Sequence, residues 1–403
     1  MGRSLRILFA GLALPYPPTN GHRLRTWAMV RALAEEGHEI TLVAFAEPEA
    51  FHADLTPLRV VCRAIELVPL PSSKSVGRET LDRLRAIASP APYAVGRLRA
   101  RSFTRALELQ LTRGSFDALI CDGIYNVQNL PREVSTPVLL NKDDVAHVIL
   151  ERYVHLERNP LRRLYAILEA RKVRRWEAKT CSRMSSVLAC SEVDRAILQR
   201  LCSEATIFVV PNVVDTDRYV PGGDQDSRTV LFQGGLDWYP NRDAVAFFVE
   251  GILPELRRLV PGAKFRVAGR SGSNAFFARF SRVPNVELTG TVPDMRSEIA
   301  RATVCAVPLR IGSGTRLKIL EAGAMGKAIV STALGAEGLS FADGEEILIA
   351  NEPSAFARAL AGLLQDEERR RTMGRAARLR VEKDYSLPVL KDALRGALAG
   401  RQW

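Results

Sequence analysis

Three observations predict an α/β protein with two doubly wound parallel sheets. Short apolar or β-branched runs alternate with longer amphipathic segments, which is typical of βαβ units. This alternation occurs twice, on either side of a Pro- and Gly-containing segment at residues 211–223. The length of 403 residues is also more than one hydrophobic core usually serves. We therefore expect two Rossmann-like domains that face a central cleft.

The composition is that of an ordinary globular protein, with 47% hydrophobic and 25% charged residues. Such a composition argues against a disordered or fibrous chain. No apolar run approaches the roughly 20 residues that a membrane-spanning helix needs. Pro15 follows the first apolar run directly, without a small-residue cleavage site, which favours a buried strand over a signal peptide. We therefore expect a cytoplasmic protein.

The first half begins with the apolar run Leu5–Ala13, a buried strand, and with the periodic segment Gly21–Glu36, a helix that Gly37 ends. The charged, periodic stretch Ala146–Met184 predicts one long helix. Further short apolar runs predict strands at His38–Phe45, Val60–Val68, Phe116–Asp122, Pro137–Asn141, Ser186–Ser191 and Ala205–Pro211. Further periodic segments predict helices at Leu81–Ala88, Ser102–Thr112 and Glu192–Leu201.

The second half repeats the same alternation. Its apolar runs predict strands at Thr229–Gly234, Lys264–Ala268, Val286–Thr289, Val304–Pro308, Ala328–Ser331 and Ile347–Ala350. Its periodic segments predict helices at Arg242–Leu259, Met295–Ala302, Arg316–Ala324 and Pro353–Gln365. A final helical stretch, Glu367–Gly400, is broken near Ser386–Pro388. Ligands of open α/β sheets bind at the carboxyl ends of the strands, so we expect function there.

The segment Gly312–Lys327 has the strongest chemical signal. A glycine loop follows a strand and leads into a helix, whose first N–H groups favour an anion. Arg316 and Lys318 add positive charge, and the carboxylate of Glu321 suits sugar hydroxyls. The alternative is a glycine loop that only turns the chain.

This segment resembles the donor-binding motif of family-4 glycosyltransferases of the GT-B fold. The motif is usually written E-x7-E; Glu321 matches its second acid, whereas Ser313 stands at the first. A subgroup of the family carries a motif written G-x-G-x-R-x-K-I-L-E-A, and the segment that begins at Gly312 is similar to this motif over nearly its whole length. The resemblance extends to Pro15–Gly21, Val210–Asp215 and Val286–Val292. It is strongest for sugar transferases of bacterial exopolysaccharide (PEP-CTERM-associated) gene clusters.

The resemblance implies a retaining transfer of a sugar from a nucleoside-diphosphate sugar, UDP- or GDP-linked, to an acceptor hydroxyl. Residues 1–211 would bind the acceptor, residues 212–384 the nucleotide sugar, and the helix in 385–403 would pack back on the first domain. The glycines of the loops would lie against the donor phosphates, and Arg270 and Thr289–Val292 against the base. The donor-binding residues we expect are Asn20, Gly21, Gly234, Gly235, Arg270, Thr291, Gly314, Thr315, Arg316, Lys318 and Glu321.

Asp122 ends a predicted strand, where many relatives carry a histidine that contacts the donor sugar. It could orient a hydroxyl, stabilise oxocarbenium character or cap the next helix. Asp143, Asp144 and His147 follow the next strand and are the other acid/base candidates. We expect catalysis to rest on Asp122, Asp144 and His147. His22, together with His38, His52 and His155, has no obvious constellation around it.

No metal or cofactor is expected. The six cysteines form no C-x-x-C pair, and the D-x-D sequence at Asp215 and Asp217 lies in the hinge, where relatives without metal carry similar residues. The helix dipole and nearby cations can stabilise a leaving diphosphate instead.

The formal charge is +12, and Glu151–Arg183 holds ten basic and four acidic residues. This stretch, with Arg97–Arg105, indicates a sugar or lipid-linked acceptor and a peripheral contact with the anionic inner face of the membrane. A solvated helix with internal ion pairs explains the stretch equally well. The absence of interleaved aromatic residues speaks against nucleic acid. Two other functions stay open: a catalytically inactive, basic carbohydrate-binding module and a sugar-nucleotide epimerase.

Overall fold

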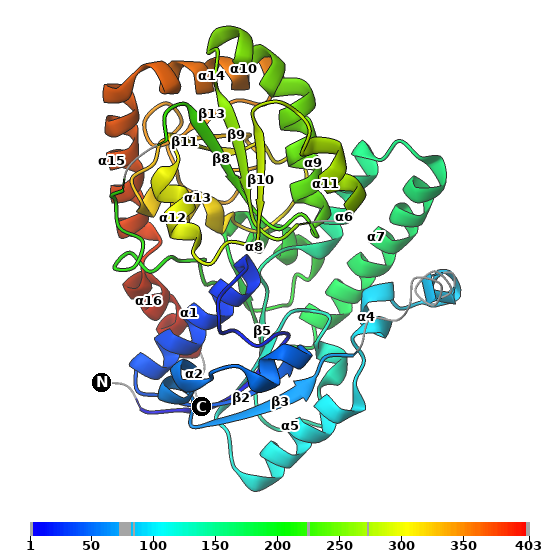
Figure 1. Ribbon diagram of the computed structural model, residues 1–403. Coiled ribbons are helices and arrows are strands. Elements are labelled where there is room, and N and C mark those ends of the chain that lie inside the picture. Colours follow the sequence, from blue (N-terminus) through cyan, green and yellow to red (C-terminus); the bar gives the residue numbers. More distant parts are fainter. Residues whose placement is uncertain (1–2, 72–81, 84, 224–225, 272–273, 400–403) are drawn as a thin grey trace. The chain divides into compact units, whose positions relative to one another are not determined.

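The computed structural model describes residues 3–71, 82–83, 85–223, 226–271 and 274–399, and they form two units (Figure 1). The first unit runs to Asn212 and also includes the chain from Leu390 onward. The second unit is Val213–Val389. Each unit contains one parallel sheet with helices around it, as the alternating pattern of the sequence predicts.

The sheet of the first unit has seven parallel strands in the order β3-β2-β1-β4-β5-β6-β7. Its central strands are buried on both faces apart from Arg6, and they are apolar except at their ends, which is why they read as apolar runs. The strands are β1 Arg6–Gly11, β2 Glu39–Ala46, β3 Ala64–Pro69, β4 Ala118–Asp122, β5 Val138–Asn141, β6 Ser186–Ala189 and β7 Ile207–Val209.

The helices of this unit connect successive strands. They are α1 Gly21–Glu35, α2 Thr56–Val61, α4 Tyr93–Arg97, α5 Arg101–Arg113, α6 Ala146–Leu156, α7 Pro160–Cys181 and α8 Glu192–Leu201, with short 3-10 turns at Pro48–His52 and Val127–Asn129. Residues 82–83 and 85–88 are also helical, whereas Leu81 and Leu84 of that predicted helix lie outside the described residues.

Two predictions for this unit are wrong. The predicted strand Val60–Val68 begins as helix, because Pro57 occupies the first turn of α2, and β3 starts only at Ala64. The single helix predicted over residues 146–184 is two helices, α6 and α7. Asn159 caps α7 by accepting hydrogen bonds from the N–H groups of Leu161 and Arg162, both at 3.1 Å, and Pro160 fits the first helical turn.

The sheet of the second unit has six parallel strands in the order β10-β9-β8-β11-β12-β13. Each strand falls within one residue of a predicted apolar run. The strands are β8 Thr229–Gln233, β9 Lys264–Ala268, β10 Val286–Gly290, β11 Val304–Val307, β12 Ile329–Ser331 and β13 Leu348–Ile349.

The helices of this unit are α9 Tyr239–Phe247, α10 Leu253–Leu259, α11 Asn274–Phe280, α12 Met295–Arg301, α13 Leu317–Ala324, α14 Pro353–Gln365 and α15 Glu367–Asp384, and α16 Leu387–Ala399 leads back into the first unit. A π-helical turn, Phe248–Ile252, joins α9 to α10, where the sequence predicts one regular helix. Pro254 has no N–H to donate, so the regular hydrogen-bond pattern is interrupted there.

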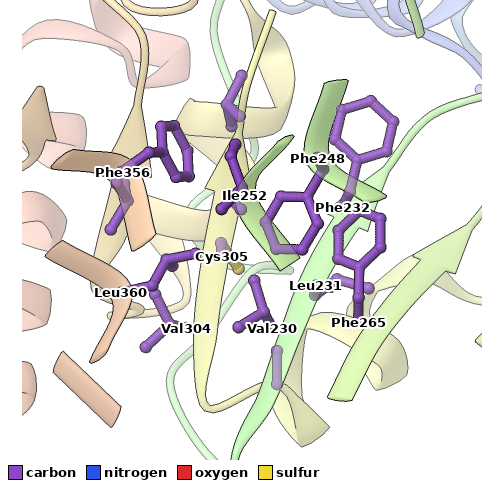
Figure 2. Close-up of a cluster of buried hydrophobic side chains, with 14 of the residues drawn as sticks. Val230, Leu231, Phe232, Phe248, Ile252, Phe265, Val304, Cys305, Phe356 and Leu360 are labelled. Atoms are coloured by element: carbon purple, nitrogen blue, oxygen red, sulfur yellow. The ribbon is translucent and has the colours of Figure 1, made fainter. Parts of the chain in front are cut away.

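A large cluster of buried apolar side chains fills the second unit between its sheet and its helices (Figure 2). Phe248 of the π-helical turn stacks on Phe265 of β9, with ring centres 3.7 Å apart. Phe356 of α14 meets Phe248 edge-on from the other side. The aromatic contacts therefore hold helices from two parts of the chain against the same strands.

In both sheets the strand order reverses between the first strand and the fourth, β1 and β4 in one unit and β8 and β11 in the other. Loops on either side of such a point leave the sheet in opposite directions. The carboxyl ends of these strands are therefore the expected ligand positions of a doubly wound sheet.

Candidate functional site

In the second unit, Glu321 of α13 lies at the carboxyl edge of the sheet. Its Oε1 accepts a hydrogen bond from the hydroxyl of Tyr219 at 2.7 Å, and its Oε2 accepts one from the Nε2 of Gln233 at 2.5 Å. Burial outweighs these partners and raises the pKa of Glu321 to about 7. Each carboxylate oxygen keeps a second lone pair, so the group can still accept from a ligand hydroxyl.

Lys318 lies one turn before Glu321. Its Nζ donates to the Oδ1 of Asn241 at 3.0 Å and lies 4.2 Å from the centre of the Phe232 ring. No described carboxylate lies within ion-pairing distance of it. Burial, with the nearby Arg316 adding repulsion, lowers the pKa of Lys318 to about 7. A ligand anion would favour the charged ammonium, so this position suits a phosphate group.

Arg316 has a different role in this structure. Its guanidinium is buried and donates to the carbonyl oxygens of Ser313 and Gly314 within its own loop. Gly312 has φ +151°, and a side chain there would meet the guanidinium at 2.7 Å. Arg316 therefore holds the glycine loop in shape, and Lys318 is the better placed cation for a ligand.

The loops that follow β8 and β9 pack closely on each other. A Cβ on Gly269 would lie 2.5 Å from the carbonyl oxygen of Gly234, so two backbones touch at this edge. Asn241 donates its Nδ2 to the carbonyl oxygen of Gly235 at 2.9 Å. Arg270 is half-exposed and pairs with Asp237 at 2.9 Å.

The remaining predicted donor residues of this unit lie on neighbouring loops. Thr291 is exposed directly after β10, and Gly314 and Thr315 precede α13. The second unit therefore brings glycine backbones, a half-buried ammonium and a buried carboxylate together at one sheet edge.

In the first unit, the loop after β1 leads into α1. Asn20 caps this helix, because its Oδ1 accepts a hydrogen bond from the N–H of Arg23 at 2.9 Å. Gly21 is the first residue of the helix. Asn20 therefore has a structural function at the position where the donor phosphates are expected.

His22 has a constellation around it, although its place in the sequence predicts none. Its Nε2 lies 3.0 Å from Asp122 Oδ2, and its Nδ1 lies 3.0 Å from Asp143 Oδ2. Burial disfavours the charged ring, but the two carboxylates outweigh burial and raise the pKa of His22 well above its ordinary value. Burial likewise opposes the ionisation of Asp143, yet His22 lowers its pKa.

Asp122 is fully engaged by this cluster. In addition to His22, it accepts hydrogen bonds from the Oγ1 of Thr26 at 2.9 Å and from the Nδ2 of Asn141 at 2.7 Å. Its side chain is 1% exposed. In this arrangement Asp122 binds and orients His22, and both His22 and Asp143 are half-buried rather than fully buried.

The other two predicted catalytic residues have different surroundings. His147 is buried in α6, and its Nδ1 and backbone N–H both bind the Oε2 of Glu177, at 2.5 and 3.0 Å. Glu177 also accepts from the Nζ of Lys142 at 2.6 Å. Burial, with Asp143 adding repulsion, raises the pKa of Asp144 to about 8, so this carboxyl can carry a proton near neutral pH.

Sequence reasoning missed His22, Gln233 and Tyr219. A signal existed for His22, because it lies in the first turn of the helix after β1, while Asp122 ends β4 and Asp143 follows the end of β5. Strand order places these three segments at one edge. Gln233 ends β8 in the same way, whereas nothing in the sequence pairs Tyr219 with Glu321.

Among the described residues, no three His, Cys, Asp or Glu side chains come together as a metal site would require. All six cysteines lie in the described part of the chain, where they are buried and form no disulfide bond. None of the described helices has both the length and the apolar character needed to cross a membrane.

Two family models match the chain and together span most of it. The model of glycosyltransferase family 4 matches residues 19–218. The model of glycosyl transferases group 1 matches residues 227–366.

Among curated relatives, a 44.6 kDa protein of the cps region of Klebsiella pneumoniae is 20% identical and covers 88% of this chain and 89% of its own. The D-inositol 3-phosphate glycosyltransferase of Corynebacterium aurimucosum is 30% identical over 43% of this chain and 47% of its own. One component of the phosphatidylinositol N-acetylglucosaminyltransferase of Arabidopsis thaliana is 26% identical over 41% of this chain and 38% of its own. The last two matches thus span less than half of each relative.

Solved structures share the fold over nearly the whole chain. Sucrose-phosphate synthase from Thermosynechococcus elongatus aligns over 99% of this chain and 100% of its own, with a TM-score of 0.73 and 16% identity. HepE from Anabaena, solved with UDP and glucose, aligns over 98% and 100%, with a TM-score of 0.69 and 12% identity. Both family models and these folds agree, and the chain is a glycosyltransferase of group 1 with the α/β GT-B fold.

Proposed function

We propose that this glycosyltransferase moves a sugar, with retention of configuration, from a nucleoside-diphosphate sugar to an acceptor hydroxyl. The observation that carries the proposal is the pair of Lys318 and Glu321 on one helix turn. A half-buried ammonium without a carboxylate partner among the described residues suits a diphosphate, and a buried carboxylate suits vicinal hydroxyls. HepE, a structural neighbour, was solved with UDP and glucose, which supports a nucleotide-sugar donor.

In this proposal the second unit binds the donor. Lys318 and the N–H groups of Gly314 and Thr315 stabilise the negative charge that grows on the departing diphosphate. Glu321 accepts from donor hydroxyls on the ribose. Arg270 and Thr291 border the base, which is uracil or guanine.

In this proposal the first unit binds the acceptor, and Gly21 lies at the carboxyl edge of that unit's own sheet. His22, charged by its two carboxylates, is the cation of that edge. Asp122 is the residue that positions His22, and Asp144 is the protonated carboxyl that a ligand oxygen can meet. His147, tied to Glu177, holds the start of α6 in place.

We propose a role in polysaccharide or glycoconjugate synthesis, with a sugar or lipid-linked acceptor at the cytoplasmic face of a membrane. The cps-region relative of Klebsiella pneumoniae supports the polysaccharide role. WaaG, a structural neighbour with a TM-score of 0.65, is a glycosyltransferase involved in lipopolysaccharide biosynthesis. The name of the Arabidopsis relative includes phosphatidylinositol, a membrane lipid.

Calorimetry with UDP-, GDP-, dTDP- and ADP-linked sugars tests the donor site, using the wild type, Glu321→Ala and the exposed control Glu352→Ala. We expect one nucleotide class to bind, with a loss in Glu321→Ala and no change in the control. No binding across the panel overturns the proposal.

Retention needs its own measurement. Proton NMR of the first product reports the anomeric configuration before it equilibrates. A product with the configuration of the donor supports a retaining reaction, and the opposite configuration contradicts it.

A further inference from the structure

Helices α6 and α7 form a hairpin whose turn projects away from the sheet of the first unit (Figure 1). Two large apolar side chains near this turn face solvent. Leu161 is 77% exposed and Leu164 is 56% exposed, one helical turn apart. Isolated exposed leucines are common, but two of them on one projecting helix end form an apolar surface, which indicates a place where another molecule binds.

Cations continue the same face of α7. Arg171 and Arg175 follow Leu164 by seven and eleven residues, which are close to whole helical turns, and both are exposed. Other exposed cations surround the leucines and the rest of the helix. They are Arg158, Arg162, Arg163, Arg174 and Lys179. Among the described residues, none of these seven has a carboxylate within ion-pairing distance.

Two of the four acidic residues of the same stretch are buried away from this face, whereas Glu151 and Glu157 stay at or near the surface. Glu169 is buried and binds the N–H of Tyr93 at 2.9 Å and the Nζ of Lys172 at 3.3 Å. Glu177 is fully buried against Lys142. Folding therefore withdraws two of the four carboxylates and leaves a cationic face with an apolar tip.

A hollow of about 250 Å³ lies between the two helices on this hairpin. Val154, Ile167 and Ala170 contribute apolar walls, and His155, Arg171 and Arg174 contribute basic groups. Glu151 is the one acidic residue of its lining. An apolar wall beside two guanidinium groups fits a lipid head group whose phosphate pairs with arginine.

We propose that the α6–α7 hairpin docks on an anionic phospholipid bilayer. Leu161 and Leu164 enter the interface, Arg171 and Arg175 pair with head-group phosphates, and the hollow holds one head group. The cations attract an anionic surface over about a Debye length, and the leucines add apolar burial that a free polyanion does not offer. The proposal goes beyond glycosyl transfer and needs no activity to be tested.

The test is co-sedimentation with phosphatidylcholine vesicles that either contain or lack phosphatidylglycerol, at low and at high salt. We expect the wild type to bind only the vesicles with phosphatidylglycerol, and less at high salt. Arg171→Gln with Arg175→Gln should weaken binding by about 25-fold, at about fivefold for each cation. Leu161→Ser with Leu164→Ser should weaken it on the order of tenfold.

The matched control is Arg59→Gln with Val60→Ser on α2. These residues are an exposed cation and an 80% exposed apolar side chain in the same unit. The control should bind like the wild type. Thermal melting and nucleotide-sugar binding, measured on the same preparations, separate a loss of docking from a loss of fold or of the donor site.

A second readout uses a folded, nearly wild-type protein. Leu161→Trp should show a blue-shifted emission when vesicles with phosphatidylglycerol are added, because the indole enters the interface. Equal binding by wild type and variants, no binding by the wild type at low salt, or binding of a short RNA without binding of vesicles overturns the proposal.

Discussion

The imidazole of His22 lies 3.0 Å from the carboxylate of Asp122 through its Nε2. The two residues are one hundred positions apart in the sequence, and Asp143 holds the other ring nitrogen at the same distance. One imidazolium thus ties the start of α1 to the carboxyl ends of β4 and β5.

Replacing His22 with alanine should destabilise the protein. Asp122 is 1% exposed and would lose its cationic partner, which costs about 3 kcal/mol. Chemical denaturation at pH 6 and 25 °C measures the loss of unfolding free energy. The exposed His52→Ala on the turn Pro48–His52 is the control and should leave stability unchanged.

The effect of His22→Ala should also depend on pH with a definite sign. The pKa of His22 is raised in the folded state, so its contribution is complete below the ordinary histidine pKa and is lost as pH rises through the folded value. The difference in unfolding free energy between wild type and variant should therefore shrink in alkaline buffer. A difference that grows with pH would show that the ring is neutral in the folded protein.

Glu177→Gln should be among the most destabilising substitutions. The carboxylate accepts hydrogen bonds from Lys142, His147 and two N–H groups of α6. Removing its charge leaves the buried ammonium of Lys142 without a counter-ion, which lowers the free energy of unfolding by about 3–5 kcal/mol. Burial opposes ionisation, but Lys142 and His147 lower the pKa of Glu177 to about 2. Its contribution is thus complete above the ordinary pKa of glutamate and is lost as pH falls toward 2.

Urea unfolding at pH 7 and at pH 3 measures this difference. The exposed Glu352→Gln should be neutral at both values. A loss at pH 7 smaller than that of the control would contradict the role assigned to Glu177.

Donor affinity should decrease as pH rises through 7, because Lys318 then loses the proton that a diphosphate requires. Nucleotide sugars suit the experiment, since their diphosphate stays fully ionised in the neutral range. Glu321 titrates near the same pH, so the Glu321→Gln background isolates the lysine. Calorimetry in two buffers of different ionisation enthalpy should detect proton uptake on binding.

Lys318→Met should abolish both the pH dependence and the proton uptake, whereas the exposed Lys383→Met should keep both. A donor affinity that is constant from pH 6 to pH 8.5 would mean that Lys318 stays charged in the free protein or does not meet the phosphates.

Gly269→Ala should displace the loop after β8. The new Cβ would lie 2.5 Å from the carbonyl oxygen of Gly234, and φ at Gly269 is +144°, which a side chain disfavours. We expect a loss of about 1–3 kcal/mol in thermal unfolding, with weaker nucleotide binding. Gly96→Ala on α4, where a Cβ meets no atom within 4 Å, should not destabilise. Unchanged melting in Gly269→Ala would contradict the close packing of the two loops.

The sequence by itself determined the order of strands and helices. Burial on both faces makes a parallel strand a continuous apolar run, and this signal is local, so β8 and β11 could be located without a structure. The same logic located the glycine loop and Glu321, because a strand end, a glycine and a helix start follow one another in the chain. Pro160 could have revealed the break between α6 and α7, since its preference for a helix start is also local.

Only the tertiary structure decided which side chains share an edge. Asp122 and His22 meet because β1 and β4 are neighbours in the sheet, and Tyr219 meets Glu321 across about one hundred residues of chain. The exposed charge of α7 is the clearest case, because a net charge taken from the sequence sets Glu169 against the arginines of the helix. Folding turns that carboxylate inward, so whether a charged side chain faces solvent or a buried partner depends on long-range packing that no local pattern encodes.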